Sequence, residues 1–301
     1  MQFLSIGVNE CADDILQQIT NELQQLNSKK ISYSIDEVNS GDSTSIICSI
    51  EDDKTQDRKS IQCYDALRIH VSNALADFII RKYEEKLISR IINSNYCYFN
   101  SVEKKEIFNL SLKIIRNEDK NLVNSLFQIH RRNVIIRKLM DYFEGSNSLI
   151  LDGFVNFRLK DYMKDLEEVV DKAVDDFLME REYREFIRLL RYFVDIQEPK
   201  FEMIHVLVGY DNKYILLDEH KKEITNECIQ DFVNEISEGE INYDDLLVSS
   251  LITLAPKKVI IHSNGQFRNK ELLETIKNVF NGKVVLCTQC DICSVNMVNK
   301  S

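Results

Sequence analysis

The feature that most constrains the fold is a long run of helical periodicity without helix breakers. Between Ile61 and Glu144 the chain contains neither glycine nor proline. Apolar residues recur there at intervals of three and four, the spacing of one face of an amphipathic helix. On the first helix this face comprises Ile61, Tyr64, Leu67, Val71, Leu75, Phe78 and Leu87. The run therefore predicts a helical layer or bundle in the middle of the chain.

Local signals divide this run into three helices. Asn100 followed by Glu103 resembles a capping box, so a second helix is expected to begin there and to extend to about Arg116. A third helix is expected from Asn121 toward Glu144, and Gly145 can end it in the left-handed cap conformation.

The segment before the helices predicts a small α+β unit. Phe3 to Val8 is a short β-rich run, and Asn9 can cap a helix that follows it. The apolar face of this helix is formed by Ile15, Ile19, Leu23 and Leu26. Residues 31 to 35 alternate apolar and polar side chains, and Ser45 to Ile50 returns as a partner strand after the turn NSGDS.

A strongly charged helix is expected after a partly extended segment, SLILDGFVNFRL. Its apolar residues form two stripes, one of Leu166, Val170, Ala173 and Phe177 and one of Tyr183, Phe186, Leu190 and Phe193. The stripes fall out of phase near Glu180, which predicts a kink or short break there, and Pro199 ends the helix.

The remaining residues change to α/β character. Met203 to Val208 and Tyr214 to Leu217 predict a hairpin across GYDNK. Helices are expected near residues 227–236, 243–254 and 269–280. The strands KKVIIH and KVVLC enclose the last helix, so we expect them to be parallel in a β-α-β unit.

These elements predict an α+β protein with an N-terminal β-α-β-β unit, a central helical layer, and a C-terminal hairpin plus a small parallel β-α-β unit. The predicted division is an α+β unit over residues 1–58 and a helical region over 59–147. Residues 148–301 then hold the charged helix, the hairpin, the β-α-β unit and a terminal cysteine cluster.

Charge and composition exclude several function classes. The formal charge of −11 argues against a broad basic surface, so nucleic acid is an unlikely partner. Neither GxxxxGK[ST] nor GxGxxG occurs. The most apolar stretch, Leu246 to Ala255, is about half the ~20 residues that a membrane span needs. The first 14 residues lack the basic start of a signal peptide, so a cytoplasmic protein with reduced thiols is expected.

Several strings in the second half are distinctive. The run DGFVNFRLKDYMKDLEEVVDKAVDDFL, with EFIRLLRYFVDIQEPK and ITLAPKKVIIH after it, resembles the YtxC-like sporulation protein family of endospore-forming Firmicutes. The resemblance lies within residues 152–262. It implies a sporulation-associated protein and assigns no activity and no catalytic residue.

The terminal stretch VVLCTQCDIC holds three cysteines at a strict spacing of three. Cys287 comes at the carboxyl end of the last predicted strand, and His262 ends the neighbouring strand KKVIIH. Ligand sites of open α/β sheets lie at this edge, and adjacent strands are about 4.8 Å apart. Cys287, Cys290, Cys293 and His262 therefore predict a Cys₃His zinc site.

An iron–sulfur cluster is the alternative for this spacing. C-x-x-C-x-x-C also occurs in bacterial ferredoxins, but the further C-P element is absent here. A fourth ligand would have to be His262, Cys228 or an external group. Reduced thiols that bind no metal are the third interpretation.

Two basic clusters are weaker candidates. Arginines at a 3-4-3 spacing form a stripe that could hold an anion or an acidic partner, namely Arg181, Arg184, Arg188 and Arg191. Interleaved acids favour an ordinary solvated face instead. Residues 130–132, 137 and 138 form a second basic patch, for which a solvated face is again favoured.

The predicted function is that of a cytoplasmic, sporulation-associated protein that binds a protein partner and carries a zinc site. A redox or iron–sulfur enzyme that uses the thiols is the competing class, so the sequence leaves open whether the protein is an enzyme.

Overall fold

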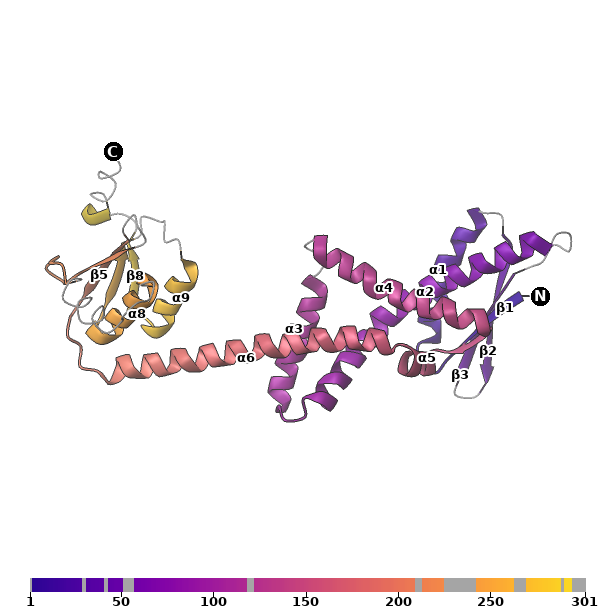
Figure 1. The fold of residues 1–301 in the computed structure, drawn as a ribbon, viewed down its shortest axis with the longest axis horizontal. Helices are drawn as coiled ribbons and strands as arrows, with labels where there is room; N and C mark the ends of the chain where they lie inside the picture. The colour runs from indigo at the N-terminus through magenta and orange to yellow at the C-terminus, as the bar shows by residue number, and fades with distance from the viewer. Residues whose placement is uncertain are drawn as a thin grey trace. The chain divides into compact units, whose positions relative to one another are not determined.

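The computed structural model describes residues 2–28, 31–40, 43–50, 57–117, 122–208, 213–224, 242–262, 269–287 and 290–293. The chain divides into two compact units, Met1–Leu178 and Met179–Ser301. Each unit holds a four-stranded sheet with helices, which confirms the predicted α+β class (Figure 1). The three-part division at residues 58 and 147 stays a prediction.

The sheet of the first unit has the order β2-β3-β1-β4. Its strands are β1 (Gln2–Val8), β2 (Tyr33–Ser40), β3 (Ser43–Ile50) and β4 (Ser148–Ile150). β1 and β2 both pair antiparallel with β3, whereas β4 pairs parallel with β1 and brings Leu149 opposite Ile6. β4 comes from the segment that was expected to be partly extended, and it returns the chain to the first sheet after three helices.

One face of this sheet forms the core, as the period of two in a strand requires. Leu4, Ile6 and Val8 of β1 are buried, whereas Phe3, which precedes Leu4, is 43% exposed. Helix α1 (Ala12–Ser28) packs against α2 (Asp57–Asn95) and buries all four residues predicted for its apolar face. The sequence pattern therefore identified the inward sides of both elements.

The middle of the chain forms the three predicted helices, α2 (Asp57–Asn95), α3 (Ser101–Asn117) and α4 (Leu122–Gly145). The capping box is confirmed, because Glu103 Oε2 accepts from the Asn100 backbone N–H at 2.9 Å and Asn100 Oδ1 accepts from that of Glu103 at 3.0 Å. Gly145 ends α4 as expected but without a positive φ. A short helix, α5 (Leu151–Arg158), follows β4.

Helix α6 runs without interruption over Lys160–Ile196, so the predicted break near Glu180 is wrong. The first stripe belongs to the core of the first unit. The second half of α6 contributes Ile187, Leu190 and Val194 to the core of the second unit. The predicted second stripe is not the buried face, because Tyr183, Phe186 and Phe193 are 38%, 54% and 49% exposed. The buried Ile187 and Val194 instead continue the heptad spacing of Leu166 and Ala173. The packing partner of α6 therefore changes at the boundary between the units without a change of phase.

The sheet of the second unit has the order β6-β5-β7-β8. Its strands are β5 (Ile204–Val208), β6 (Tyr214–Leu217), β7 (Val259–His262) and β8 (Val284–Cys287). β5 and β6 form the predicted antiparallel hairpin, and β7 and β8 are the predicted parallel pair. The parallel pairing of β5 with β7 joins the hairpin and the parallel pair into one sheet.

Helix α8 (Tyr243–Leu254) precedes β7, and helix α9 (Lys270–Val279) connects the parallel strands β7 and β8. Asn242 and Asn269 cap them, with each side-chain oxygen accepting from a backbone N–H at 3.0 Å. Ile204, Val206, Val259 and Ile261 form the buried core of the sheet with residues of both helices. The helix predicted near residues 227–236 lies outside the described residues.

Candidate metal centre

The sheet register brings His262 and Cys287 to the same level. β7 and β8 are parallel neighbours, and His262 is the direct partner of Cys287 at their carboxyl ends. Residues 291–293 form a helical turn beyond β8, which carries Cys290 and Cys293 back toward His262. Each of the four side chains is thus placed by a strand end or by the turn that follows it.

The four candidate ligands lie close together. One ligand atom from each of His262, Cys287, Cys290 and Cys293 lies within 4.8 Å of all the others. His262 Nδ1 is 3.3 Å from Cys290 Sγ and 3.4 Å from Cys293 Sγ. Cys293 Sγ lies 3.6 Å from Cys290 Sγ and 4.0 Å from Cys287 Sγ. His262 and Cys293 are buried, whereas the other two cysteines are half-buried.

These separations are those of ligands around a single tetrahedral ion. Zn–S bonds of about 2.3 Å and Zn–N bonds of about 2.0 Å give S···S edges of about 3.8 Å and N···S edges of about 3.5 Å at tetrahedral angles. In a four-iron cluster each cysteine binds a different iron atom, so the body of the cluster separates the sulfurs further. The group can therefore hold one metal ion.

The thiols differ in their readiness to ionise. Burial opposes ionisation of Cys290, but hydrogen bonds from the Cys293 backbone N–H and from the neighbouring thiols outweigh it and lower the pKa of Cys290. Burial and the adjacent sulfurs raise the pKa of Cys293 to about 11. Cys290 therefore ionises more easily than Cys293, and a bound cation would offset the cost of ionising the thiols.

His262 is held at its second ring nitrogen by a residue that the sequence reasoning missed. His205 Nδ1 lies 2.8 Å from His262 Nε2. Burial lowers the pKa of both imidazoles, which favours the neutral rings that a metal ligand and its acceptor need. A metal-bound histidine usually donates its other N–H to such a partner. The period of two places His205 on the opposite face of β5 from Ile204 and Val206, and only the sheet order shows that β7 lies beside it.

The other described cysteines lie apart from this group and are free thiols, namely Cys11, Cys48, Cys63 and Cys97. Burial raises the pKa of Cys48 to about 12, as expected for a thiol that packs as a small apolar side chain. Cys228, considered as a fourth cluster ligand, lies outside the described residues.

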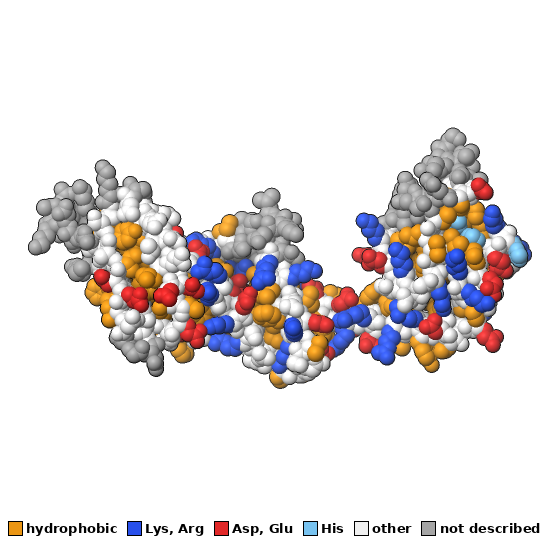
Figure 2. Space-filling model, turned by 180° about the vertical axis from the view of Figure 1, so that it is seen from behind, with side chains coloured by type: hydrophobic (Ala, Val, Ile, Leu, Met, Phe, Trp, Pro, Cys, Tyr) orange, Lys and Arg blue, Asp and Glu red, His pale blue; other side chains and the backbone are white. Residues whose placement is uncertain are grey.

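The arginine stripe is divided between different contacts. Arg191 is half-buried, and its Nη2 and Nε donate to the Asn278 carbonyl oxygen of α9 at 2.6 and 3.1 Å. Arg184 lies 3.8 Å from Glu180 Oε1 on the same helix. Arg181 and Arg188 are exposed. Blue and red side chains are interspersed on the face that Figure 2 shows. A joint role of the four arginines in anion or partner contact stays a prediction.

The second basic patch is not a uniform solvated face. Arg131 is 1% exposed and forms an ion pair with Glu84 of α2. Arg132 contacts Asp77 at the surface with Nε 2.6 Å from Oδ1.

Within the described ranges, no helix has both the length and the apolarity to cross a bilayer.

The sequence profile of the YtxC-like family matches residues 69–285. An uncharacterised protein, YtxC of Bacillus subtilis (strain 168), is 26% identical over 215 residues, which are 70% of this chain and 73% of the relative. No solved structure matches. His205 and His262 lie within the residues matched by the profile, whereas the three cysteines follow its last matched residue. Because the profile match spans more than half of the chain, this protein belongs to the YtxC-like family.

Proposed function

We propose that this protein binds one Zn²⁺ ion through Cys287, Cys290, Cys293 and His262. The observation that carries the proposal is the set of four ligand separations between 3.3 and 4.0 Å. Each lies within about 0.2 Å of the corresponding edge of a tetrahedral Cys₃His site, about 3.5 Å for N···S and about 3.8 Å for S···S. The remaining two ligand pairs lie within 4.8 Å. Thiolate and imidazole ligands also suit zinc better than magnesium or calcium, which prefer oxygen.

The ion has a structural role in this proposal. Four protein ligands fill a tetrahedral shell and leave no open position for water or substrate, which distinguishes structural from catalytic zinc sites. β8 is the last strand of its sheet, and Val285 and Leu286 are 43% and 41% exposed. Because little apolar burial holds this strand, a metal bridge between β7 and the turn after β8 would stabilise the end of the sheet.

The protein then acts by binding a partner in the cytoplasm during sporulation. The absence of an open metal position favours a binding function over catalysis at this site. The cellular context rests on the resemblance of the strings around residues 152–262 to a sporulation-associated family. A protein partner is favoured over nucleic acid because the chain carries a formal charge of −11.

The competing function is redox chemistry at the thiols or at an iron–sulfur cluster. The spacing of the cysteines and the lowered pKa of Cys290 favour it. The short separations between the sulfurs favour the single ion instead.

Metal analysis of anaerobically purified protein tests the proposal. We expect one equivalent of zinc and no visible absorbance, and Cys290→Ser to retain much less zinc. Cys97→Ser is the matched control, because Cys97 is an exposed thiol outside the cluster. Brown material that contains iron would support the competing function. Protein without either metal, with Cys290→Ser as stable as the parent, would exclude both the zinc site and the iron–sulfur cluster.

Partner binding needs a separate experiment. Protein loaded with zinc and protein treated with a chelator are used as baits in extracts of sporulating cells. We expect a partner that is retained by the zinc-loaded bait. Recovery of nothing beyond a bait-free control would contradict the binding function and leave the zinc site unaffected.

A further inference from the structure

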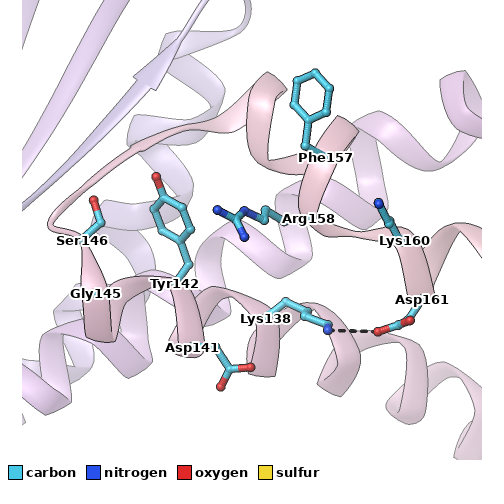
Figure 3. Close-up of a pocket in the computed structure, with 9 residues that line it drawn as sticks. All are labelled: Lys138, Asp141, Tyr142, Gly145, Ser146, Phe157, Arg158, Lys160 and Asp161. Atoms are coloured by element: carbon cyan, nitrogen blue, oxygen red, sulfur yellow. Dashed lines mark ion pairs between the residues drawn. The ribbon is translucent and has the colours of Figure 1, made fainter.

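The first unit contains an open groove that is remote in sequence from the metal centre. It lies between the C-terminal end of α4, the end of α5 and the start of α6, and its volume is about 760 Å³ (Figure 3). It is lined by Lys138, Asp141, Tyr142, Gly145, Ser146, Phe157, Arg158, Lys160 and Asp161. Its volume falls within the roughly 300–1,000 Å³ of small-molecule sites.

The charges in the groove do not cancel locally. Lys138 Nζ lies 3.0 Å from Asp161 Oδ2, so these two groups neutralise each other. Within the described ranges neither Arg158 nor Lys160 forms an ion pair with a carboxylate. Figure 3 shows the Asp141 carboxylate pointing away from Arg158. Three basic and two acidic side chains line the groove, so its lining carries a net charge of +1 on a protein whose overall charge of −11 repels anions at long range.

The Arg158 guanidinium is oriented by an aromatic ring. Its Cζ lies 5.9 Å from the centre of the Tyr142 ring, and the Tyr142 hydroxyl donates to the Ser148 carbonyl oxygen at 3.1 Å. The hydrogen bond fixes the position of the Tyr142 ring, and the ring attracts the guanidinium through a cation–π interaction. The planar donor fork of Arg158 thus remains available for an oxyanion.

An exposed aromatic side chain lies at the same groove. Phe157 is 74% exposed, and Figure 3 shows its ring at the edge of the groove, pointing away from the Arg158 guanidinium, which extends toward Tyr142. A large exposed apolar group at the edge of a groove that contains an arginine suits a ligand with a charged end and an extended apolar or aromatic remainder.

We propose that this groove binds a small phosphorylated molecule, with Arg158 and Lys160 contacting the phosphate and Phe157 packing against the rest of the ligand. Arginine binds two phosphate oxygens through parallel N–H groups, and lysine adds a compact point charge. The site is independent of the metal centre and of any protein partner.

Binding of AMP and of inorganic phosphate to the full-length protein at constant ionic strength tests the proposal. We expect saturable binding by calorimetry, together with a rise in Tm that grows with ligand concentration. Arg158→Gln combined with Lys160→Gln should weaken binding of both ligands by at least about tenfold. The matched control is Arg116→Gln combined with Lys172→Gln, which removes the same net charge from exposed positions outside the groove.

The remaining comparisons separate the parts of the proposal. Phe157→Ser should weaken binding of AMP but leave that of phosphate unchanged. Absence of saturable binding by the parent protein, or equal binding by the two double variants, would overturn the site. Retention of the protein on vesicles containing phosphatidic acid, lost in the groove double variant and without AMP binding in solution, would assign the phosphate to a lipid headgroup and overturn the small-molecule ligand.

Discussion

His262 is contacted at both of its ring nitrogens. Nδ1 faces Cys290 and Cys293, and Nε2 faces His205 Nδ1 at 2.8 Å. If Nε2 carries the proton and donates it to His205, the lone pair of Nδ1 is directed at the sulfurs. In that arrangement the acceptor on β5 selects the tautomer in which His262 can bind a metal.

Replacement of His205 tests this arrangement. His205→Phe removes the acceptor and should lower zinc affinity by about 10- to 100-fold, whereas His205→Gln keeps an acceptor oxygen and should retain most of the affinity. Competition with a chromophoric chelator measures both. His220→Phe is the control, because the His220 side chain is 82% exposed. Equal zinc affinity of the Phe and Gln variants would contradict the role assigned to His205.

The residues of the metal centre differ in how far the sequence could identify them. The cysteines and His262 were predictable because their spacing and their place at strand ends are local features. His205 precedes His262 by a long stretch of chain, and its contact depends on the pairing of β5 with β7. Strand order arises from packing of the whole unit, so it is not encoded in any local pattern.

At the scale of elements, helices α2, α4 and α6 are joined by a buried polar network. Glu84 Oε1 of α2 accepts from Arg131 of α4 and from the Tyr162 hydroxyl of α6, the latter at 2.7 Å. Burial raises the pKa of Glu84, while the attraction of Arg131 lowers it. Removing one partner from such a network leaves the other group buried without compensation.

Arg131→Met should therefore destabilise the first unit by about 3–5 kcal/mol, the cost typical of a buried charge that loses its partner. Arg131→Met combined with Glu84→Leu should recover much of this loss, because neither charge then remains buried. Arg132→Ala is the control, since its pair with Asp77 is partly exposed and contributes at most about 1 kcal/mol. Urea unfolding measures the stability of all three variants. If Arg131→Met alone were as stable as Arg132→Ala, the prediction would be refuted.

The sequence predicted these helices but not their network. The period of three and four identified α2, α3 and α4 because amphipathic packing repeats along each helix. Arg131 sits beside His130 and Arg132 in the sequence, and charge alone suggested a solvated face. A buried arginine is recognisable only when Glu84 on another helix is known to face it.

For the whole molecule, the two units have separate hydrophobic cores, and the proposed metal belongs to the second alone. Metal removal should therefore lower the stability of one unit without affecting the other. We expect two unfolding transitions, of which a chelator shifts only one.

Hydrogen exchange assigns the transition. A zinc chelator should accelerate exchange in β7 and β8 and leave β1, α1 and α2 unchanged. The variant Cys290→Ser should resemble the chelated protein without any chelator present. Uniform acceleration across both units would show that they unfold together.

The uninterrupted course of α6 also determines where the chain can be cut. Pro199 marks the obvious end of a helix in the sequence, so a truncated gene for the second half would naturally start there. Such a fragment would lack Ile187, Leu190 and Val194, which belong to the second core. A fragment beginning at Met179 would keep them. A chimera that combines the first unit of one relative with the second unit of another would accordingly need its junction inside helix α6, after Leu178. Neither a loop nor a glycine marks this position in the sequence.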